Sequence, residues 1–556
     1  MVIFQEDEQN KKLAESRNEE EESLARLLGE RYGLKYLDLT LVPVNLDALR
    51  LIPEADAKRG LIVAFNLIAQ RLDVGVMSPN NPATEQIVAG LVEQGYTVTQ
   101  YIISQGSLDR VMQRYADLSY SLNVKAGALD IASDEIQHVI DTVRTTDDVK
   151  KLISDLITQT HSKKISKILE IMVAGGLATG ASDIHMEPEE HMVRIRYRLD
   201  GVLQDVTELE QPTYAYLLSR IKLLSGLKLN LHGTQDGRFS IEVKNSEIEI
   251  RTSILPGAYN EAIVMRILNP DSISVPLESL GIEPRLLELI MKQLAKPNGM
   301  VLTTGPTGSG KTTALYAFLR KIHSPGVKII TIENPIEYHL PGIVQTQTDP
   351  EKNYTFLGGL RAALRQDPDV IMVGEIRDDE TAEIAINSAL TGHLVFSTLH
   401  TNNAAGTFPR LIDLGVNPKI LTSAINISMA QRLTRKLCPH CKKEQALNDT
   451  DKTLINRVLA DMAHKEDIPQ MEKMWMPVGC DKCNNSGYKG RIGIFEAILA
   501  DKKIEEALQG NPSEREVAAA AKSQGINTMQ QDGILKVLRG VISLEELERV
   551  VDLEDK

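Results

Sequence analysis

The sequence predicts a protein built from several α/β domains. Its 556 residues are too many for one compact core, because single cores rarely grow beyond about 250–300 residues. Short apolar runs typical of strands alternate with stretches of helical periodicity in three parts of the chain. The hydrophobic fraction of 42% and the charged fraction of 25% are ordinary for a globular protein. Three or four domains are therefore expected.

Changes in composition and periodicity predict the domain boundaries. Charged residues dominate up to Glu22, and a polar stretch separates the first alternating region from strand pairs such as "HMVRIRYRLDGVLQDV". Asn269-Pro270 ends the second region. The expected segments are a disordered acidic lead-in over 1–22, an N-terminal α/β domain over 23–118, a linker and exposed helix over 119–165, a second α/β domain over 166–272, a third over 273–437, a cysteine-bearing element over 438–495 and a helical region over 496–556.

Charge and hydropathy limit the possible locations and partners. The net charge of −14 argues against nucleic-acid binding by the protein as a whole. The longest near-apolar run, residues 61–69, has nine residues, whereas a membrane-spanning helix needs about 20. The first residues, "MVIFQEDEQNKK", do not fit a secretory signal. A cytoplasmic location without a nucleic-acid partner is expected.

The stretch "GPTGSGKT", residues 305–312, fits the phosphate-binding pattern G-x-x-x-x-G-K-[ST] at every fixed position. A strand, "MVLTT", precedes it and a helical stretch follows, which a chance match in a Gly-rich turn would lack. Backbone N–H groups at such a helix N-terminus favour phosphate. Lys311 would reach the β- and γ-phosphates of ATP, and Thr312 would ligate Mg²⁺. The predicted nucleotide-binding residues are Gly305, Pro306, Thr307, Gly308, Ser309, Gly310, Lys311, Thr312 and Thr313.

Acidic residues and histidines flank the later strands of the third domain. Glu333 and Glu337 come just after the apolar run "VKIITI", and Glu375 follows "VIMV". His393 and His400 bracket one further strand, "LVFST". Because the C-terminal ends of strands line the ligand crevice of a doubly wound sheet, we expect these side chains to converge on bound phosphates. Taken singly, each is also explained as a solvated loop residue or a structural histidine.

Longer stretches resemble the secretion ATPases of the type II secretion and type IV pilus family. The similar stretches are "GPTGSGKTT", "IENPIEY", "LRAALRQDPDVIMVGEIRDDETAEIAINSALTGHLVFSTLHTN" and "AQRLTRKLCPHC". The resemblance extends from about residue 24 to the end of the chain. It implies that the third domain is a RecA-like P-loop domain that hydrolyses ATP. It also implies that the buried strand before Glu375 normally ends in Gly-Glu in this family.

The resemblance assigns roles to the polar residues of the third domain. Glu337 corresponds to the general base, Glu333 belongs to the same acidic box, and Glu375 lies near Mg²⁺. His393 and His400 match the family's histidine box. The family usually has Glu-Asp-Pro where this chain has Glu333-Asn334-Pro335, which leaves open the role of that position.

Arginines occupy alternating positions in the second domain. Arg194, Arg196 and Arg198 alternate with apolar residues, so they share one face of a strand. An arginine aimed at the γ-phosphate stabilises the charge of the transition state, and one supplied by a neighbouring subunit couples hydrolysis to subunit contact. A solvated face with local ion pairs explains the same pattern. The resemblance implies a PAS-like domain here, with catalytic roles for Arg238, Arg251 and Arg266.

The four cysteines form two C-x-x-C pairs, Cys438/Cys441 and Cys480/Cys483. Four thiolates suit tetrahedral Zn²⁺ in a structural site with no open coordination position. A redox pair and an iron–sulfur cluster are the alternatives. The stretch after the second pair, "NNSGYKGRIGIFE", resembles the assembly and export ATPases of the family, which favours export of subunits over retraction.

The N-terminal stretches "LARLLGERYGLKYLDLT" and "LIPEADAKRGLIVAF" resemble the domain through which these motors dock on membrane-associated partners. A generic α/β domain without a docking role is the alternative. Some relatives bind cyclic di-GMP through tandem segments there. Most of that stretch would precede residue 24, so no cyclic di-GMP binding is expected.

The expected function is that of a homohexameric, Mg²⁺-dependent ATPase that powers type IV pilus assembly at the inner face of the cytoplasmic membrane. The expected partners are a polytopic inner-membrane platform protein and other cytoplasmic-face components of the machine. A type II secretion motor is the near alternative. A nucleic-acid translocase and a non-hydrolysing scaffold, the latter suggested by Asn334 alone, are alternatives from other classes.

Overall fold

The computed structural model describes residues 21–39, 42, 44–68, 70–93, 95–115, 133–158, 164–243, 246–269, 275–349, 352–510 and 512–553. The chain forms two units, Met1–Asp130 and Ile131–Lys556. Nearly all of the predicted lead-in and the start of the predicted linker, 119–132, lie outside the described residues. The expected α/β multidomain fold class is confirmed, since mixed sheets and helices recur in both units. No helix among the described residues is both long enough and apolar enough to cross a membrane.

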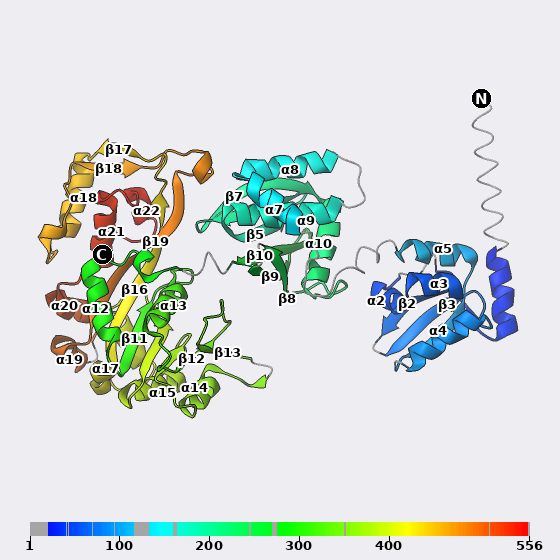
Figure 1. Cartoon of the computed structure of the whole chain (residues 1–556), viewed down its shortest axis with the longest axis horizontal. Coiled ribbons are helices and arrows are strands. Elements are labelled where there is room, and N and C mark those ends of the chain that lie inside the picture. The colour runs from blue at the N-terminus through cyan, green and yellow to red at the C-terminus, as the bar shows by residue number, and fades with distance from the viewer. Residues whose placement is uncertain are drawn as a thin grey trace. The chain divides into compact units, whose positions relative to one another are not determined.

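The N-terminal unit contains a four-stranded sheet in the order β1-β4-β3-β2 (Figure 1). β2 and β3 form an antiparallel hairpin, and β4 runs parallel to both β3 and β1. Apolar side chains of β2 and β3 are buried against the helices of this unit. In addition to a helix over 21–32, the elements are β1 (Lys35–Tyr36), α2 (Leu46–Arg50), α3 (Glu54–Gly60), β2 (Ile62–Ile68), β3 (Arg71–Val76), α4 (Pro82–Glu93), β4 (Thr97–Ile102) and α5 (Gln105–Gln113).

The second domain is a six-stranded antiparallel sheet in the order β7-β6-β5-β10-β9-β8. Along β6 the apolar residues after Met192 are buried, and the hydroxyl of Tyr197 donates to the carbonyl of Met172 at 2.6 Å. The alternating arginines therefore face away from the helices. α7 and α8, within the predicted linker, pack against α9. The elements are α7 (Ser133–Thr142), α8 (Thr146–Thr158), α9 (Lys164–Thr179), β5 (Ala181–Pro188), β6 (Met192–Leu199), β7 (Val202–Glu210), α10 (Gln211–Leu224), β8 (Gln235–Val243), β9 (Ser246–Pro256) and β10 (Glu261–Leu268).

The third domain is a seven-stranded sheet in the order β13-β12-β14-β15-β11-β16-β19. All neighbouring strands are parallel except β16 and β19. The central strands are buried on both faces, and a separate hydrophobic core lies on each side of the sheet. The elements are η1 (Leu277–Ser279), α12 (Pro284–Leu294), β11 (Gly299–Thr304), α13 (Lys311–Ile322), β12 (Ile329–Glu333), β13 (Val344–Gln347), α14 (Phe356–Leu364), β14 (Val370–Val373), α15 (Asp379–Leu390), β15 (Leu394–Leu399), α16 (Thr407–Asp413), α17 (Pro418–Ala424), β16 (Ile425–Leu437) and β19 (Tyr488–Leu499).

The cysteine-bearing element is inserted between β16 and β19, and β19 crosses the predicted border at residue 495. β19 pairs with β16 and so extends the sheet, and its apolar residues are mostly buried. This strand therefore belongs to the third domain. The insert consists of β17 (Lys443–Ala446), α18 (Asp449–Leu459), η3 (Lys465–Asp467), β18 (Lys473–Met476) and η4 (Asp481–Cys483). The C-terminal helices are α19 (Lys502–Leu508), α20 (Glu514–Ala521), η5 (Lys522–Gln524), α21 (Met529–Leu538) and α22 (Leu544–Glu548).

Buried carboxylates fix the C-terminal helices to the sheet. Asp532 on α21 accepts the N–H of Phe495 at 2.7 Å and pairs with Lys536 at 2.5 Å. Glu546 on α22 accepts hydrogen bonds from the backbone and guanidinium of Arg435 on β16. Because buried charges are tolerated only when paired and hydrogen-bonded, these contacts specify where the helical region packs.

Candidate nucleotide site and cysteine cluster

The predicted phosphate-binding loop lies between β11 and α13. Gly305 and Gly310 have positive φ angles of 149° and 89°. A Cβ at Gly305 would lie 2.6 Å from the carbonyl oxygen of Gln431, and one at Gly310 would lie 2.8 Å from the Gln431 side-chain nitrogen. Both positions therefore require glycine, because the loop approaches β16 too closely for a side chain.

Lys311 is the first residue of α13 and is only 9% exposed. Its Nζ donates to the carbonyl oxygens of Gly305 at 2.8 Å and Pro306 at 3.1 Å. Burial lowers the pKa of Lys311, while the nearby Glu375 acts in the opposite direction. The ammonium group is thus held against the concave side of the loop, where a phosphate would meet it.

Glu375 and His400 lie at the same edge of the sheet as this loop. Glu375 follows β14, and its Oε2 lies 2.7 Å from Nε of Arg377 and 3.4 Å from Nε2 of His400, which follows β15. The structure thus brings Glu375 together with His400 and with Lys311, whose pKa it influences. Glu375 and Thr312 both offer oxygen ligands, the kind that Mg²⁺ prefers.

His393 lies elsewhere. It precedes β15, its carbonyl accepts the N–H of Gly299 at the start of β11, and its Nδ1 is 3.1 Å from the carbonyl oxygen of Ser388. β15 and β11 are parallel, so this is the amino edge of the sheet. The structure therefore does not bring His393 to the other predicted site residues.

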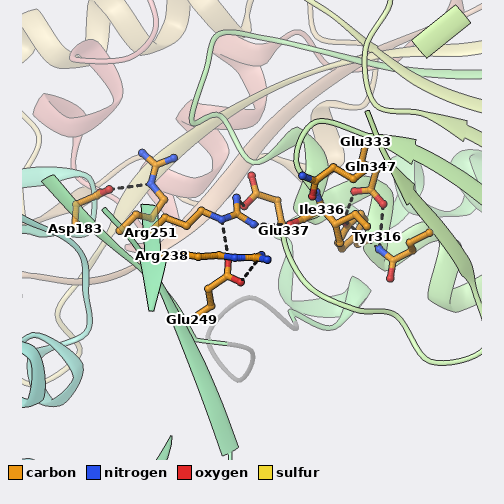
Figure 2. A network of polar contacts seen from close by, with 11 residues as sticks. Asp183, Arg238, Glu249, Arg251, Tyr316, Glu333, Ile336, Glu337 and Gln347 are labelled. Atoms are coloured by element: carbon orange, nitrogen blue, oxygen red, sulfur yellow. Dashed lines mark hydrogen bonds and ion pairs between the residues drawn. The ribbon is translucent and has the colours of Figure 1, made fainter. Parts of the chain in front are cut away.

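Glu333 is held in a buried network at the end of β12 (Figure 2). Glu333 is only 2% exposed. Its Oε1 accepts hydrogen bonds from the Thr331 hydroxyl at 2.6 Å and from the Gln345 amide at 3.0 Å. The Tyr316 hydroxyl donates to Oε2. Burial raises the pKa of Glu333, and these three hydrogen bonds act in the opposite direction. Glu333 thus faces protein groups on both oxygens.

Glu337 is more accessible, with a side chain 36% exposed. Its Oε2 lies 3.8 Å from Nη1 of Arg251, which comes from the second domain. The same arginine donates to the carbonyl of Ile336 at 2.7 Å, and the N–H of Ile336 donates to Gln347 at 3.2 Å (Figure 2). Both backbone polar groups of the residue before Glu337 are therefore fixed.

The three predicted arginines form one row across neighbouring strands. Arg251 on β9 lies directly opposite Arg238 on β8 and Arg266 on β10. Arg238 pairs with Glu249 at 3.2 Å, and Arg266 pairs with Asp183 at 2.9 Å, both within the second domain. Figure 2 shows Arg251 extending toward Glu337. Arg251 reaches the third domain, where it contacts Ile336 and Glu337.

Two contributors to the site were not predicted. The helical pattern around Tyr316 predicts a position in the hydrophobic core. Its hydroxyl was the one feature that indicated a hydrogen-bonding role. Arg432 approaches the phosphate loop, since its Nη1 is 3.1 Å from the position of a Cβ at Gly305. A single charged residue within the run "INISMAQRL" was the available signal.

The four cysteine sulfurs lie within 4.8 Å of one another. Individual Sγ–Sγ separations are 3.9 Å for Cys438–Cys480, 3.8 Å for Cys441–Cys483 and 3.7 Å for Cys480–Cys483. Four sulfurs placed tetrahedrally about 2.3 Å from a central zinc would be about 3.8 Å apart. Backbone N–H groups of Gly479 and Gly487 also point at sulfurs, each at 3.3 Å. This donor set fits a tetrahedral metal ion.

The parallel sheet, the glycine loop with its buried lysine and the acidic strand ends define a P-loop ATPase. Residues 158–549 match the family model described as type II/IV secretion system protein. The chain belongs to this family, and the expected enzyme class, an ATP hydrolase of the secretion ATPases, is confirmed.

Individual relatives agree with this assignment. A type II secretion system protein E from Klebsiella pneumoniae is 41% identical over 72% of this chain and 78% of its own length. A type IV pilus assembly ATPase, PilB, from Pseudomonas aeruginosa is 36% identical over 95% of this chain and 90% of its own. The solved structure of the ATPase DotB from Legionella pneumophila shares the fold, with a TM-score of 0.51 at 22% identity over 71% of this chain and 97% of that one.

Replacing Lys311 tests the phosphate loop. We expect Lys311→Ala to reduce ATP turnover by at least about 10²-fold and to weaken nucleotide binding, because the cation that meets the phosphates is lost. Lys321→Ala, on the exposed side of the same helix, is the matched control and should leave both unchanged. Equal turnover of the two variants in a phosphate-release assay would refute this placement of the nucleotide.

Proposed function

We propose that this protein is the hexameric motor ATPase of type IV pilus assembly, working at the inner face of the cytoplasmic membrane with a polytopic platform protein. The supporting observation is the extent of similarity. Three pilus assembly ATPases each align over 95% of this chain, including its N-terminal unit. The type II secretion relatives align over 71–76% of it.

A type II secretion motor is the second candidate. The observation in its favour is the higher identity of these relatives, 40–41% against 34–36% for the pilus ATPases. The shared region is the part that hydrolyses ATP. The N-terminal unit is the part that would select the machine, because docking rather than chemistry separates the two functions.

In the proposed mechanism ATP is the substrate and its phosphates lie in the loop before α13. Lys311 neutralises phosphate charge, and Glu337 orients the attacking water and accepts its proton. Thr312 and Glu375 would hold Mg²⁺, which when bound neutralises charge on the phosphate oxygens. His400 contacts Glu375 at 3.4 Å and is placed to respond to the γ-phosphate. Arg251 keeps a positive charge close to Glu337.

A gene replacement tests the biological role. In a host whose own copy is replaced by Lys311→Ala, we expect loss of surface pili with normal secretion of folded exoproteins, while Lys321→Ala supports both. Sheared surface pilin and secreted protein are measured from the same cultures. Loss of exoprotein secretion with intact pili would refute the pilus assignment and favour the type II secretion motor.

Two glutamine substitutions separate the roles of Glu337 and Glu375. Glu337→Gln should retain ATP binding and lower turnover by about 10² to 10⁴, because a general base is lost. Glu375→Gln should also lower turnover but should shift the Mg²⁺ dependence of nucleotide affinity. A Mg²⁺ titration of nucleotide binding distinguishes them. A shift in the Glu337 variant alone would mean that the two roles are exchanged.

We also propose that the four cysteines bind one structural Zn²⁺. The single tryptophan, Trp475, lies on β18 and packs against Gly540, where a Cβ would approach its ring to 2.5 Å. Lys442, next to Cys441, also lies 5.6 Å from the ring centroid. Trp475 therefore reports on the packing of the cysteine element against the C-terminal helices.

Removing the metal with a strong chelator should shift Trp475 emission to longer wavelength, because the cysteine element loosens and water reaches the ring. Nucleotide affinity should change by less than about twofold, since the ligands are separate from the phosphate loop. A Cys441→Ala variant should already show the shifted emission and should not respond to the chelator. Iron, or no metal, in elemental analysis of reduced protein would refute the zinc assignment.

A further inference from the structure

Glu337 lies on the connection between β12 and β13, residues 334–343, which we call the acidic loop. Side chains of β13 hold this loop on both sides of Glu337. Gln347 accepts the N–H of Ile336 at 3.2 Å. Gln345 donates to the carbonyl of Tyr338 at 3.1 Å and accepts the N–H of Leu340 at 2.6 Å. The backbone at Glu337 is therefore set by its neighbours.

The phosphate-binding helix enters the same network through Tyr316. This residue of α13 is fully buried, and its hydroxyl donates to Glu333. Its ring meets that of Tyr338 edge to face, with centroids 4.7 Å apart at 75°. The Tyr316 oxygen also lies 3.4 Å from the amide nitrogen of Gln345. One side chain thus contacts a residue on each side of Glu337 and the amide that holds the loop.

Tyr316 is well placed to transmit position because it shares a rigid helix with Lys311. The two residues are five apart, which corresponds to about 7.5 Å along a helix axis. In the proposed mechanism the start of α13 positions the phosphates, and the acidic loop positions the carboxylate of Glu337. Tyr316 joins the two through its hydrogen bonds to Glu333 and Gln345.

We infer that Tyr316 and Gln345 are positioning residues, which place Glu337 relative to the phosphate-binding helix through the buried carboxylate of Glu333. Glu333 is likewise a positioning residue, because both of its carboxylate oxygens accept hydrogen bonds from protein groups. A satisfied buried polar network of this kind fixes geometry, because leaving any member without its partner is costly. The inference rests on the proposed role of Glu337 as the base.

Tyr316→Phe tests this by removing only the hydroxyl. We expect kcat to fall by about tenfold, with a ceiling of about 10²-fold for a displacement near 1 Å. The KM for ATP and nucleotide affinity should stay within about twofold. Tyr354→Phe is the matched control, because its hydroxyl bonds to Thr346 at 2.9 Å without contacting Glu333 or the acidic loop. It should leave kcat unchanged. Gln345→Met, of similar size, should behave as Tyr316→Phe.

A double-mutant cycle with Glu337→Gln, measured in single turnovers, distinguishes positioning from a general loss of structure. If Tyr316 acts through Glu337, then Tyr316→Phe should cause no further loss in the Glu337→Gln background. A loss of the same size in both backgrounds would overturn the inference, as would an unchanged kcat in Tyr316→Phe. If Tyr316→Phe does not fold, Gln345→Met is put through the same cycle and decides in the same way.

The cycle also separates this inference from the assignment of the base. Wild-type turnover in Glu337→Gln would refute the proposed base and with it the inference. Impaired turnover in Glu337→Gln, combined with additive effects of Tyr316→Phe, would preserve the base and refute the positioning role alone.

Discussion

The parallel alignment of β12, β14, β15 and β11 is the constraint on which the site depends. Their C-terminal ends lie within two residues of one another, since Ile332 lies opposite Val373, Val373 lies opposite Ser397, and Leu399 lies opposite Thr304. The segments that follow the strands therefore begin at a common edge. This one geometric fact brings the phosphate loop, the acidic loop, Glu375 and His400 together. A register slip of one residue would turn these side chains to the other face of the sheet.

The same constraint explains which parts of the site could be predicted from sequence. The phosphate loop and Glu375 follow apolar strands directly, so a motif and strand order were sufficient to place them. His393 was grouped with them because it adjoins the same strand as His400, but the six residues of β15 separate its two ends by about 20 Å. Tyr316 and Arg251 were harder to assign. In the sequence Tyr316 looks like a residue of the hydrophobic core. Arg251 contacts the loop at Ile336, 85 residues away in sequence, and periodicity cannot show such a long-range contact.

Strand pairing also explains how two cysteine pairs that are far apart in sequence meet in space. Leu437 at the end of β16 lies opposite Tyr488 at the start of β19. The chain thus leaves and re-enters the sheet at one point, with Cys438 directly after the first strand and Cys483 shortly before the second. The intervening residues form an antiparallel strand pair, β17 and β18, with the helix α18 between them. The two cysteine pairs therefore meet in space despite the long insert. Sequence spacing indicated that the four cysteines would cluster, as they do, but not that β19 would complete the ATPase sheet.

The second domain touches the ATPase domain in two distinct regions. At one, Arg251 divides its hydrogen bonds between Glu249 and the carbonyl of Ile336, beside Glu337. At the other, Asp200 accepts the N–H of Gly490 at 2.8 Å, and Asn484 accepts that of Thr146 at 3.2 Å, next to the cysteine cluster. Lys311, in contrast, donates to the carbonyls of Gly305 and Pro306 in the third domain. A displacement of the second domain would therefore change the surroundings of Glu337 while leaving the phosphate cradle in place. We therefore expect nucleotide binding and hydrolysis to be separable. Glu337, although its loop is held from α13 and β13, also contacts Arg251 of the second domain, whereas Lys311 donates to carbonyl groups of its own loop.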